Sequence, residues 1–162
     1  MNIEAPTTEI ANAALWFCEA LQISQYKASL DIHFIEDFET PDDYDNAAGW
    51  IEYADGHGDI YIRRDYANPR EDQIEILAHE MVHFKQYVTG QMVSISGKNE
   101  VYWEGQVFMA SNDPETLTYW ESPWELEAFG KQQGLEYRYK ASLEPMSKTT
   151  LEVLLQMASS YS

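Results

Sequence analysis

The sequence predicts a single α+β domain in which a small antiparallel sheet is followed by two long helices. Alternating apolar and polar residues come first, at residues 29–35, 49–54 and 60–64, and such alternation is typical of strands with one buried face. Apolar residues at spacings of three and four follow, at residues 69–89 and 123–140, and this is the pattern of amphipathic helices. At 162 residues the chain is long enough to bury one sizeable core.

The N-terminal part is expected to place one helix before the sheet. Thr7 or Thr8 would cap this helix, which runs to about Gln22 with its apolar residues on one side. Residues 36–48 are rich in carboxylates and predict an acidic loop, and residues 55–59 form a turn-rich connection between two strands.

The helix expected at residues 69–89 has start and stop signals of its own. Asn68 would be its N-cap and Pro69 its first helical residue, while Glu71 would reach back as in a capping box. Gly90 stands where helices commonly end. The residues between these signals are therefore expected to be helical.

Three further elements complete the prediction. Residues 92–108 would form a hairpin around residues 98–99, and residues 149–159 a last amphipathic helix. Ser122 as N-cap and Pro123 as first residue mark the start of the helix at 123–140.

Residues 79–83 read HEMVH and lie in the middle of the first long helix. His79 and His83 are four positions apart, so both imidazoles leave the same helix face and can bind one metal ion. Glu80 lies beside them and is placed to take a proton from a water molecule on that metal. The alternative is an ordinary helix with two exposed histidines, but the buried apolar stripe around the motif favours a metal site.

A catalytic zinc site needs a third protein ligand. The helix at 123–140 is the best place for it, because its first turns carry two carboxylates and it follows the motif at a distance that allows the chain to reverse. Residues 125–128 read ELEA. With the HExxH motif, this segment resembles the gluzincin group of zinc metallopeptidases, which pair HExxH with a later Glu-x-x-Ala pattern. A closer similarity, over residues 68–90 and 119–134, is to small phage-encoded metallopeptidase-like proteins with an HExVH helix and a PWExEA segment.

The resemblance implies a zincin-like fold and a Zn²⁺ ion held by His79, His83 and Glu125, with Glu80 as the catalytic residue. It also implies that the small side chain of Ala128 lets the two helices approach closely. The implied activity is hydrolysis of peptide bonds through a water molecule on the metal, with a peptide or protein as substrate.

The third ligand stays open between two glutamates. Glu125 follows Ser122 by three positions and could instead complete a capping box. Glu127 would then be the ligand, although it projects about 200° away around the helix. Related enzymes often place an acidic residue four positions after the ligand to orient a histidine, but Phe129 occupies that position here, so this partner must come from elsewhere.

A further group would stabilise the oxyanion that forms during peptide hydrolysis. Tyr87, Tyr119 and Tyr137 lie on or near the two helices, and His57 lies at a hairpin tip. The sequence does not choose among them, and packing or a turn position is the default role of each. His33 is expected at the surface.

The charge of the chain limits its partners. The formal net charge is −18, with an isoelectric point near 4.3. Such a field repels nucleic acid and anionic membranes and favours basic peptide segments. It also allows a second function, an acidic interaction or inhibitor protein that mimics nucleic-acid charge and keeps a vestigial or structural metal site. A binding module has no use for Glu80, and a structural zinc site would favour Cys ligands, so catalysis is preferred.

The chain is expected in the cytoplasm, in that of the host if it is phage-encoded. Cys18 is the one cysteine and is expected to be buried, so no intrachain disulfide can form. The first residues lack the basic and apolar regions of a signal peptide. No apolar run approaches the roughly 18 residues of a membrane span. No repeat or linker divides residues 1–162, and the strand at 60–64 is expected at a sheet edge, where an extended peptide could add.

Overall fold

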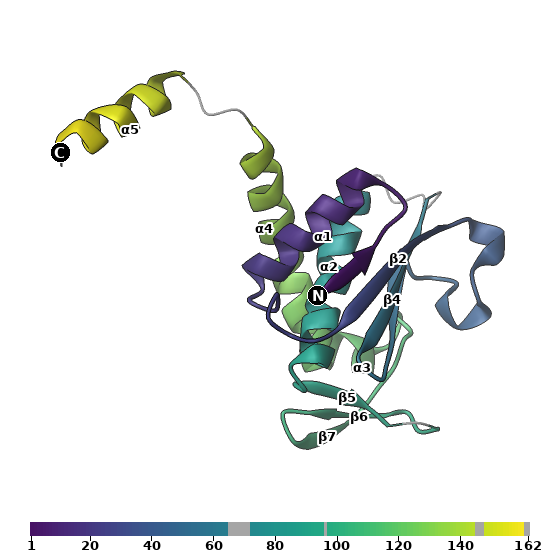
Figure 1. The fold of residues 1–162 in the computed structure, drawn as a ribbon. Helices are drawn as coiled ribbons and strands as arrows, with labels where there is room; N and C mark the ends of the chain where they lie inside the picture. The colour runs from purple at the N-terminus through teal and green to yellow at the C-terminus, as the bar shows by residue number, and fades with distance from the viewer. Residues whose placement is uncertain (65–71, 96, 145–147, 161–162) are drawn as a thin grey trace.

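The computed structural model of this chain describes residues 1–64, 72–95, 97–144 and 148–160 (Figure 1). These residues form a mixed α+β arrangement of two sheets and five α-helices, which confirms the predicted class. The strands are β1 (Asn2–Glu4), β2 (Ser29–Ile35), β3 (Gly49–Ala54), β4 (His57–Arg63), β5 (Met92–Ser94), β6 (Glu100–Trp103) and β7 (Gln106–Met109). The helices are α1 (Thr8–Ala20), α2 (Gln73–Val88), α3 (Leu117–Glu121), α4 (Pro123–Leu143) and α5 (Lys148–Ser160).

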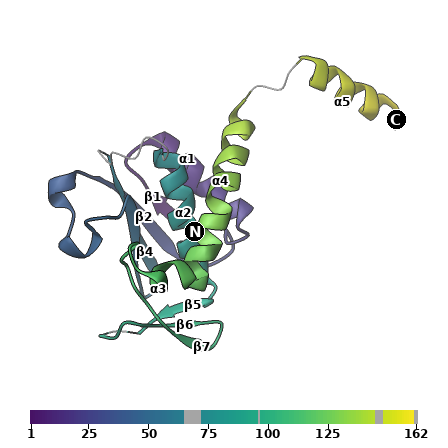
Figure 2. The same cartoon turned by 180° about the vertical axis from the view of Figure 1, so that it is seen from behind.

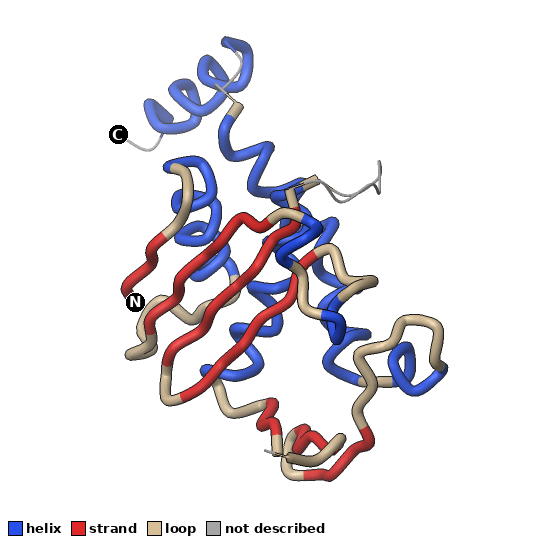
Figure 3. The backbone as a smooth tube through the Cα atoms, turned by 90° about the vertical axis from the view of Figure 1, so that its right-hand side faces the viewer, coloured by secondary structure: helices blue, strands red, loops and turns tan. Residues whose placement is uncertain are grey.

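The larger sheet has the strand order β1-β2-β4-β3 and is mixed rather than antiparallel (Figure 3). β1 pairs with β2 and β2 with β4 in parallel, while β3 and β4 are antiparallel. The prediction of an antiparallel sheet is therefore wrong. Helix α1 connects β1 to β2, and such a crossover lets neighbouring strands run in the same direction. The three-residue strand β1 is too short to give an alternating pattern in the sequence.

The third and fourth strands form a tight hairpin. Its turn consists of Asp55 and Gly56 alone, both with positive φ (52° and 80°), as in the two-residue turns that match the twist of a sheet. β4 consequently starts at His57, and the predicted five-residue connection is wrong. The hairpin also places β4 between β2 and β3. The expected edge strand at 60–64 is thus internal, and the edges are β1 and β3.

The core lies between the sheet and its helices. Helices α1 and α2 pack against one face of the sheet, and α4 packs on these two helices (Figures 1 and 2). Helix α1 is capped by Thr7, whose side chain accepts a hydrogen bond from the Ile10 amide at 3.2 Å, as predicted, but it ends at Ala20 rather than Gln22. Cys18 is buried as expected, and burial raises the pKa of its thiol to about 12.

The second sheet is antiparallel, with the order β5-β6-β7. Pairing of β5 with β6 confirms the hairpin predicted around residues 98–99. A second tight turn at Glu104 and Gly105 adds β7, which the sequence prediction lacked. Trp103 and Trp124 pack together beside this sheet. In Figure 1 the last helix, α5, lies apart from the other elements.

No helix within the described residues is long and apolar enough to span a membrane.

Gly49 lets strand β3 approach helix α2, and its replacement tests this contact. A Cβ atom at Gly49 would lie 2.6 Å from Ile76 Cγ2 and 2.9 Å from the Tyr61 carbonyl oxygen. We therefore expect Gly49→Ala to lower the free energy of unfolding by about 1–3 kcal/mol through overpacking. Gly130→Ala is the control, because nothing lies within 4 Å of its added methyl group. That change should stabilise helix α4 by up to about 1 kcal/mol. Urea denaturation measures both, and equal stabilities would contradict the close approach.

Candidate metal centre

Helix α2 carries the HExxH residues along its middle. Asp72 caps the helix, its carboxylate accepting from the Glu75 amide at 2.9 Å. The helix therefore starts at Gln73, four residues later than predicted, and the expected start signals at 68–71 lie outside the described residues. At the other end Gly90 has a φ of +73°, as predicted for a residue that ends a helix.

His79, His83 and Glu125 converge in space. The two Nε2 atoms of the histidines lie 3.1 Å apart. Glu125 Oε2 lies 3.3 Å from Nε2 of His79, and Glu125 Oε1 lies 3.5 Å from Nε2 of His83. One ligand atom from each residue can be chosen so that all three lie within 4.8 Å of one another. All three side chains are 8–12% exposed. This is the spacing that a single metal ion between them requires.

Helix α4 supplies Glu125 to this centre. Pro123 is its first residue, as predicted, but Ser122 makes no side-chain cap: its hydroxyl donates to the Thr118 carbonyl at 2.7 Å, and its amide donates to the Tyr119 carbonyl at 3.2 Å. Neither half of the capping box with Glu125 is therefore formed. Ala128 has no exposed surface and lies in the core cluster that includes α2. The carboxylate of Glu125 is thus available to the histidines.

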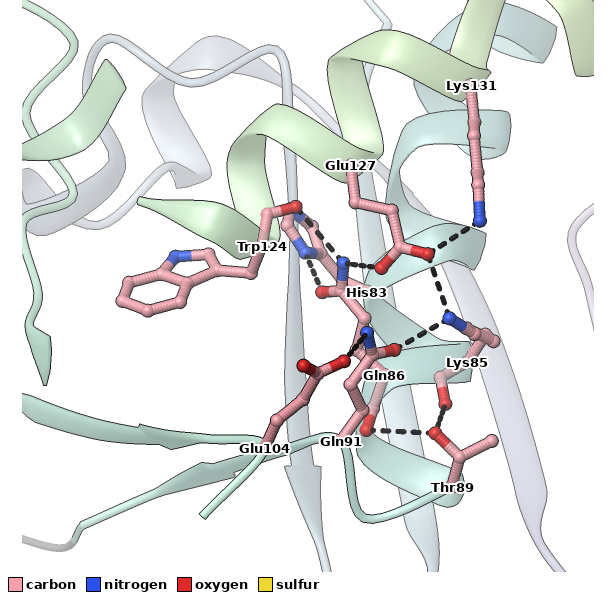
Figure 4. A network of polar contacts seen from close by, with 9 residues as sticks. All are labelled: His83, Lys85, Gln86, Thr89, Gln91, Glu104, Trp124, Glu127 and Lys131. Atoms are coloured by element: carbon pink, nitrogen blue, oxygen red, sulfur yellow. Dashed lines mark hydrogen bonds and ion pairs between the residues drawn. The ribbon is translucent and has the colours of Figure 1, made fainter. Parts of the chain in front are cut away.

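The alternative ligand, Glu127, points to another set of partners (Figure 4). Its carboxylate accepts hydrogen bonds from Lys85 at 2.8 Å, Lys131 at 2.5 Å and the amide of Gln86 at 2.9 Å. Burial alone would raise the pKa of Glu127, but these partners hold it at about 2. The charge of Glu127 is therefore satisfied by two lysines and one amide, away from the candidate metal ligands His79, His83 and Glu125.

Gln86 orients the imidazole of His83. Its Oε1 lies 2.8 Å from Nδ1 of His83, while its amide nitrogen donates to Glu127 and, at 3.1 Å, to the Trp124 carbonyl (Figure 4). Because the amide nitrogen is committed to two acceptors, Oε1 must accept from His83. The proton of neutral His83 is then on Nδ1, and the lone pair of Nε2 faces Glu125.

Gln132 does the same for His79 from helix α4. Its Oε1 lies 2.8 Å from Nδ1 of His79, and its amide nitrogen donates to Glu75 Oε1 at 3.0 Å. Each histidine is thus held by a glutamine that is itself held by a glutamate. These glutamines fill the role that Phe129 could not, since Phe129 packs against the His79 ring, with centroids 4.6 Å apart. Sequence reasoning missed both, although Gln132 lies seven positions after Glu125 and so on the same helix face.

The residues of the centre fit a metal cation. With both Nδ1 atoms donating, the atoms that meet at the centre are two imidazole lone pairs and two carboxylate oxygens, all of them acceptors. Glu125 Oε2 is buried and has no hydrogen-bond partner among the described residues. Acceptors packed this closely repel one another unless a positive charge lies between them. Two imidazoles and one carboxylate form a ligand set that Zn²⁺ takes in catalytic sites.

The charges of the centre are strongly coupled. Burial alone would lower the pKa of His83. The Glu125 carboxylate beside the imidazole outweighs burial and raises the pKa to about 9. Burial likewise raises the pKa of Glu125, yet His83 and His79 hold it well below its usual range. A positive charge at the centre is therefore favoured.

Glu80 lies next to the metal group and is only 4% exposed. Burial raises the pKa of its carboxyl, the two histidines lower it, and Glu125 raises it again, with a net upward shift. Within the part of the chain that the structure describes, its carboxylate makes no hydrogen bond, and it lines the same cleft as the metal group. This leaves the carboxylate available to a water molecule or substrate.

A cleft of about 1030 Å³ opens over the centre. Tyr87 and Tyr119 line it and remain candidates for an oxyanion donor. Tyr137 is 77% exposed and does not line the cleft. The hydroxyl groups of Tyr87 and Ser94 form a hydrogen bond of 3.1 Å. Trp124 also lines the cleft. The structure therefore reduces the three tyrosines to two.

His57 lies away from the centre. It points from strand β4 to a sheet face where its Nδ1 lies 2.7 Å from the Ser29 hydroxyl and its Nε2 lies 3.3 Å from Asp59. His33 bonds the same aspartate at 2.8 Å and is 40% exposed, so its expected surface position is confirmed. The suggestion that His57 approaches the metal centre is wrong. A hairpin tip gives no information about the face to which a side chain points.

Gln132 offers a test of the orienting role. We expect Gln132→Ala to weaken zinc binding by about 10- to 100-fold, because His79 loses the acceptor that fixes its ring. Gln133→Ala is a matched control: the neighbouring glutamine is exposed and has no contact with the centre. Competition with a fluorescent zinc chelator measures both affinities. Equal losses in the two variants, or none in either, would contradict the orienting role.

Comparison of the chain with protein-family models, with curated proteins and with solved structures finds no match.

Proposed function

We propose that this chain is a zinc-dependent metallopeptidase of the zincin type. His79, His83 and Glu125 would hold Zn²⁺, and Glu80 would be the general base. The observation that carries the proposal is the convergence of the acceptor atoms of His79, His83 and Glu125. The carboxylate of Glu80 lies beside them and lines the same large cleft. The HExxH helix and the second helix with its glutamate are the features expected of that fold.

The residues divide the work of hydrolysis among them. Zn²⁺ held by His79, His83 and Glu125 would supply Lewis-acid chemistry for a peptide carbonyl and for a water molecule. Glu80 would take a proton from the attacking water and then deliver it to the leaving amine. Gln86 and Gln132 keep both Nε2 lone pairs directed at the centre. Tyr87 or Tyr119, which both line the cleft, would donate a hydrogen bond to the developing oxyanion.

A second candidate function rests on the net charge of −18. An acidic interaction or inhibitor protein would use its surface to occupy a basic partner, and the metal group would then be structural or vestigial. Such a protein has no use for a buried carboxylate beside the metal ligands. The position of Glu80 in the cleft therefore favours catalysis.

Zinc content and hydrolysis test the proposal together. The purified chain should bind one Zn²⁺, cleave members of a broad peptide library, lose cleavage with a chelator and regain it with zinc. His79→Ala and His83→Ala should each lose the ion, because two ligands cannot replace a three-ligand site. His33→Ala is the control, since this histidine lies on the exposed sheet face. Full zinc retention in both cleft variants, or a zinc-loaded chain that cleaves no peptide, would refute the proposal.

A further inference from the structure

One wall of the cleft is formed by an acidic segment at residues 42–45. Asp42, Asp43 and Asp45 all line the cleft. Among the described residues, no lysine, arginine or histidine lies within ion-pair distance of their side chains, although ion pairs are formed elsewhere along the chain. Three exposed carboxylates therefore lie along the same cleft without an ion-pair partner among the described residues, and a positive charge that enters the cleft lowers their mutual repulsion.

The acidic segment is held in place by a buried arginine. Arg63, at the end of strand β4, is 8% exposed, and its guanidinium donates to the carbonyl oxygens of Asp45 at 2.8 Å and Ala47 at 3.2 Å. It also pairs with the carboxylate of Asp37. Arg63 thus binds the backbone of the segment and an aspartate outside the cleft. These contacts restrain the C-terminal end of the segment, which would reduce the entropy cost of binding a ligand.

Aromatic rings accompany these carboxylates. Tyr44 lies within the acidic segment and stacks on Trp50, with ring centroids 4.6 Å apart and an interplanar angle of 7°. Both residues line the cleft. Trp50 is stacked by both Tyr44 and Tyr61 and is buried, so Tyr44 is the ring of this pair that an incoming cation would meet. An aromatic ring beside carboxylates attracts an ammonium or guanidinium group through the ring quadrupole and through the neighbouring negative charge. The wall therefore suits a lysine or arginine side chain.

The rest of the cleft does not offset this charge. Outside the centre itself, five carboxylates line it, Glu100 and Asp113 in addition to the three of the acidic segment. Lys98 is the one lysine or arginine among the described lining residues, and its ammonium lies 3.9 Å from Glu100. With Zn²⁺ bound, the charge of the ion would be balanced by Glu80 and Glu125. The walls of the cleft would then remain negative, and a cleft of one sign concentrates ligands of the opposite sign.

We propose that the substrate of this centre is a polypeptide with lysine or arginine next to the scissile bond, received by the wall formed by residues 42–45. This inference rests on the proposed function and names its substrate class. The basic side chain would lie against Tyr44 and the three aspartates while the adjoining peptide bond reaches the metal centre. A peptide with glutamate at the same position would meet unpaired carboxylates and be rejected.

The first experiment compares two fluorogenic peptides that differ only in lysine or glutamate on either side of the cleaved bond. At low ionic strength kcat/KM should favour the lysine peptide by at least about tenfold, and salt should reduce the difference. The triple variant Asp42→Asn/Asp43→Asn/Asp45→Asn should lose most of this preference. The control Glu4→Gln/Glu9→Gln/Glu19→Gln changes the net charge equally at exposed positions outside the cleft and should keep it.

A second measurement separates this inference from the proposed function. Fluorescence anisotropy of the labelled lysine peptide with the zinc-loaded Glu80→Gln variant reports binding without cleavage. Cleavage of both peptides at equal rates would overturn the substrate inference and leave the peptidase proposal standing. Tight binding that the aspartate triple variant abolishes, without cleavage by the unaltered chain, would overturn the peptidase proposal and retain the acidic cleft as a site for basic segments. Neither binding nor cleavage would overturn both.

Discussion

Replacing Glu80 by glutamine is expected to abolish peptide hydrolysis and to leave zinc bound. The amide has nearly the shape of the carboxylate but cannot accept the proton of the attacking water. General-base catalysis contributes about 10²- to 10⁴-fold, so we expect kcat to fall by at least a hundredfold. Because Glu80 makes no hydrogen bond within the described part of the chain and is only 4% exposed, losing its charge should leave the fold intact.

Three measurements on this variant belong together: zinc per chain, thermal unfolding, and hydrolysis of a peptide that the unaltered chain cleaves. Glu121→Gln is the matched control, since it makes the same chemical change on an exposed residue that does not line the cleft. It should retain full activity. If Glu80→Gln hydrolyses peptides within tenfold of the unaltered chain, Glu80 is not the base. If it loses zinc or the fold, its role is structural.

The parts of the fold that could be predicted are those determined by local sequence. The HEMVH segment lies on a helix because apolar residues recur at spacings of three and four around it and Gly90 ends it. Pro123 fixed the start of α4 in the same way. These signals act within one or two turns of helix, so no knowledge of distant contacts is needed.

Two of the errors, the direction of the strands and the start of α2, have a common cause in contacts between segments far apart in the chain. Strand direction depends on where a crossover returns, so the mixed sheet could not be derived from alternation in each strand. The start of α2 was placed by Pro69, yet Asp72 is the residue whose side chain caps the helix. Both residue types are strong start signals, and a choice between them needs tertiary information.

The candidate metal centre shows the same division between features set by local sequence and features set by distant contacts. The spacing of His79 and His83 within one helix was sufficient to predict that their ring nitrogens lie close together. Gln132 was not predicted because it meets His79 across the interface between α2 and α4, and the two residues are 53 positions apart in the chain. Gln86 lies only three positions from His83, but its oxygen is directed at the imidazole by contacts of its amide nitrogen with Trp124 and Glu127 on α4. Glutamine is also common on exposed helix faces, so its type alone carries little information. Burial distinguishes Gln132 from its exposed neighbour Gln133, and burial is a property of the fold.

Replacing Glu125 by alanine is expected to weaken zinc binding by orders of magnitude, at least about a hundredfold, because it removes one of three protein ligands. Glu127→Ala should keep the ion within about tenfold of the original affinity. Its carboxylate binds Lys85 and Lys131 rather than the histidines, and Gln86 retains the Trp124 carbonyl as an acceptor. The loss of these partly exposed ion pairs should cost about 1 kcal/mol of stability or less.

Competition with a chromogenic chelator, together with urea denaturation, separates these outcomes. If Glu125 merely capped its helix, its removal would cost about 1 kcal/mol of stability and spare the metal. The geometry argues against that result, because Ser122 donates to Thr118 and forms no cap with Glu125. Zinc lost only in Glu127→Ala would show that the ion pairs with the two lysines break when the metal binds. The side chain of Glu127 would then have to leave the two lysines and reorient toward His83. The buried carboxylate of Glu125 would have only His79 and His83 to offset its charge.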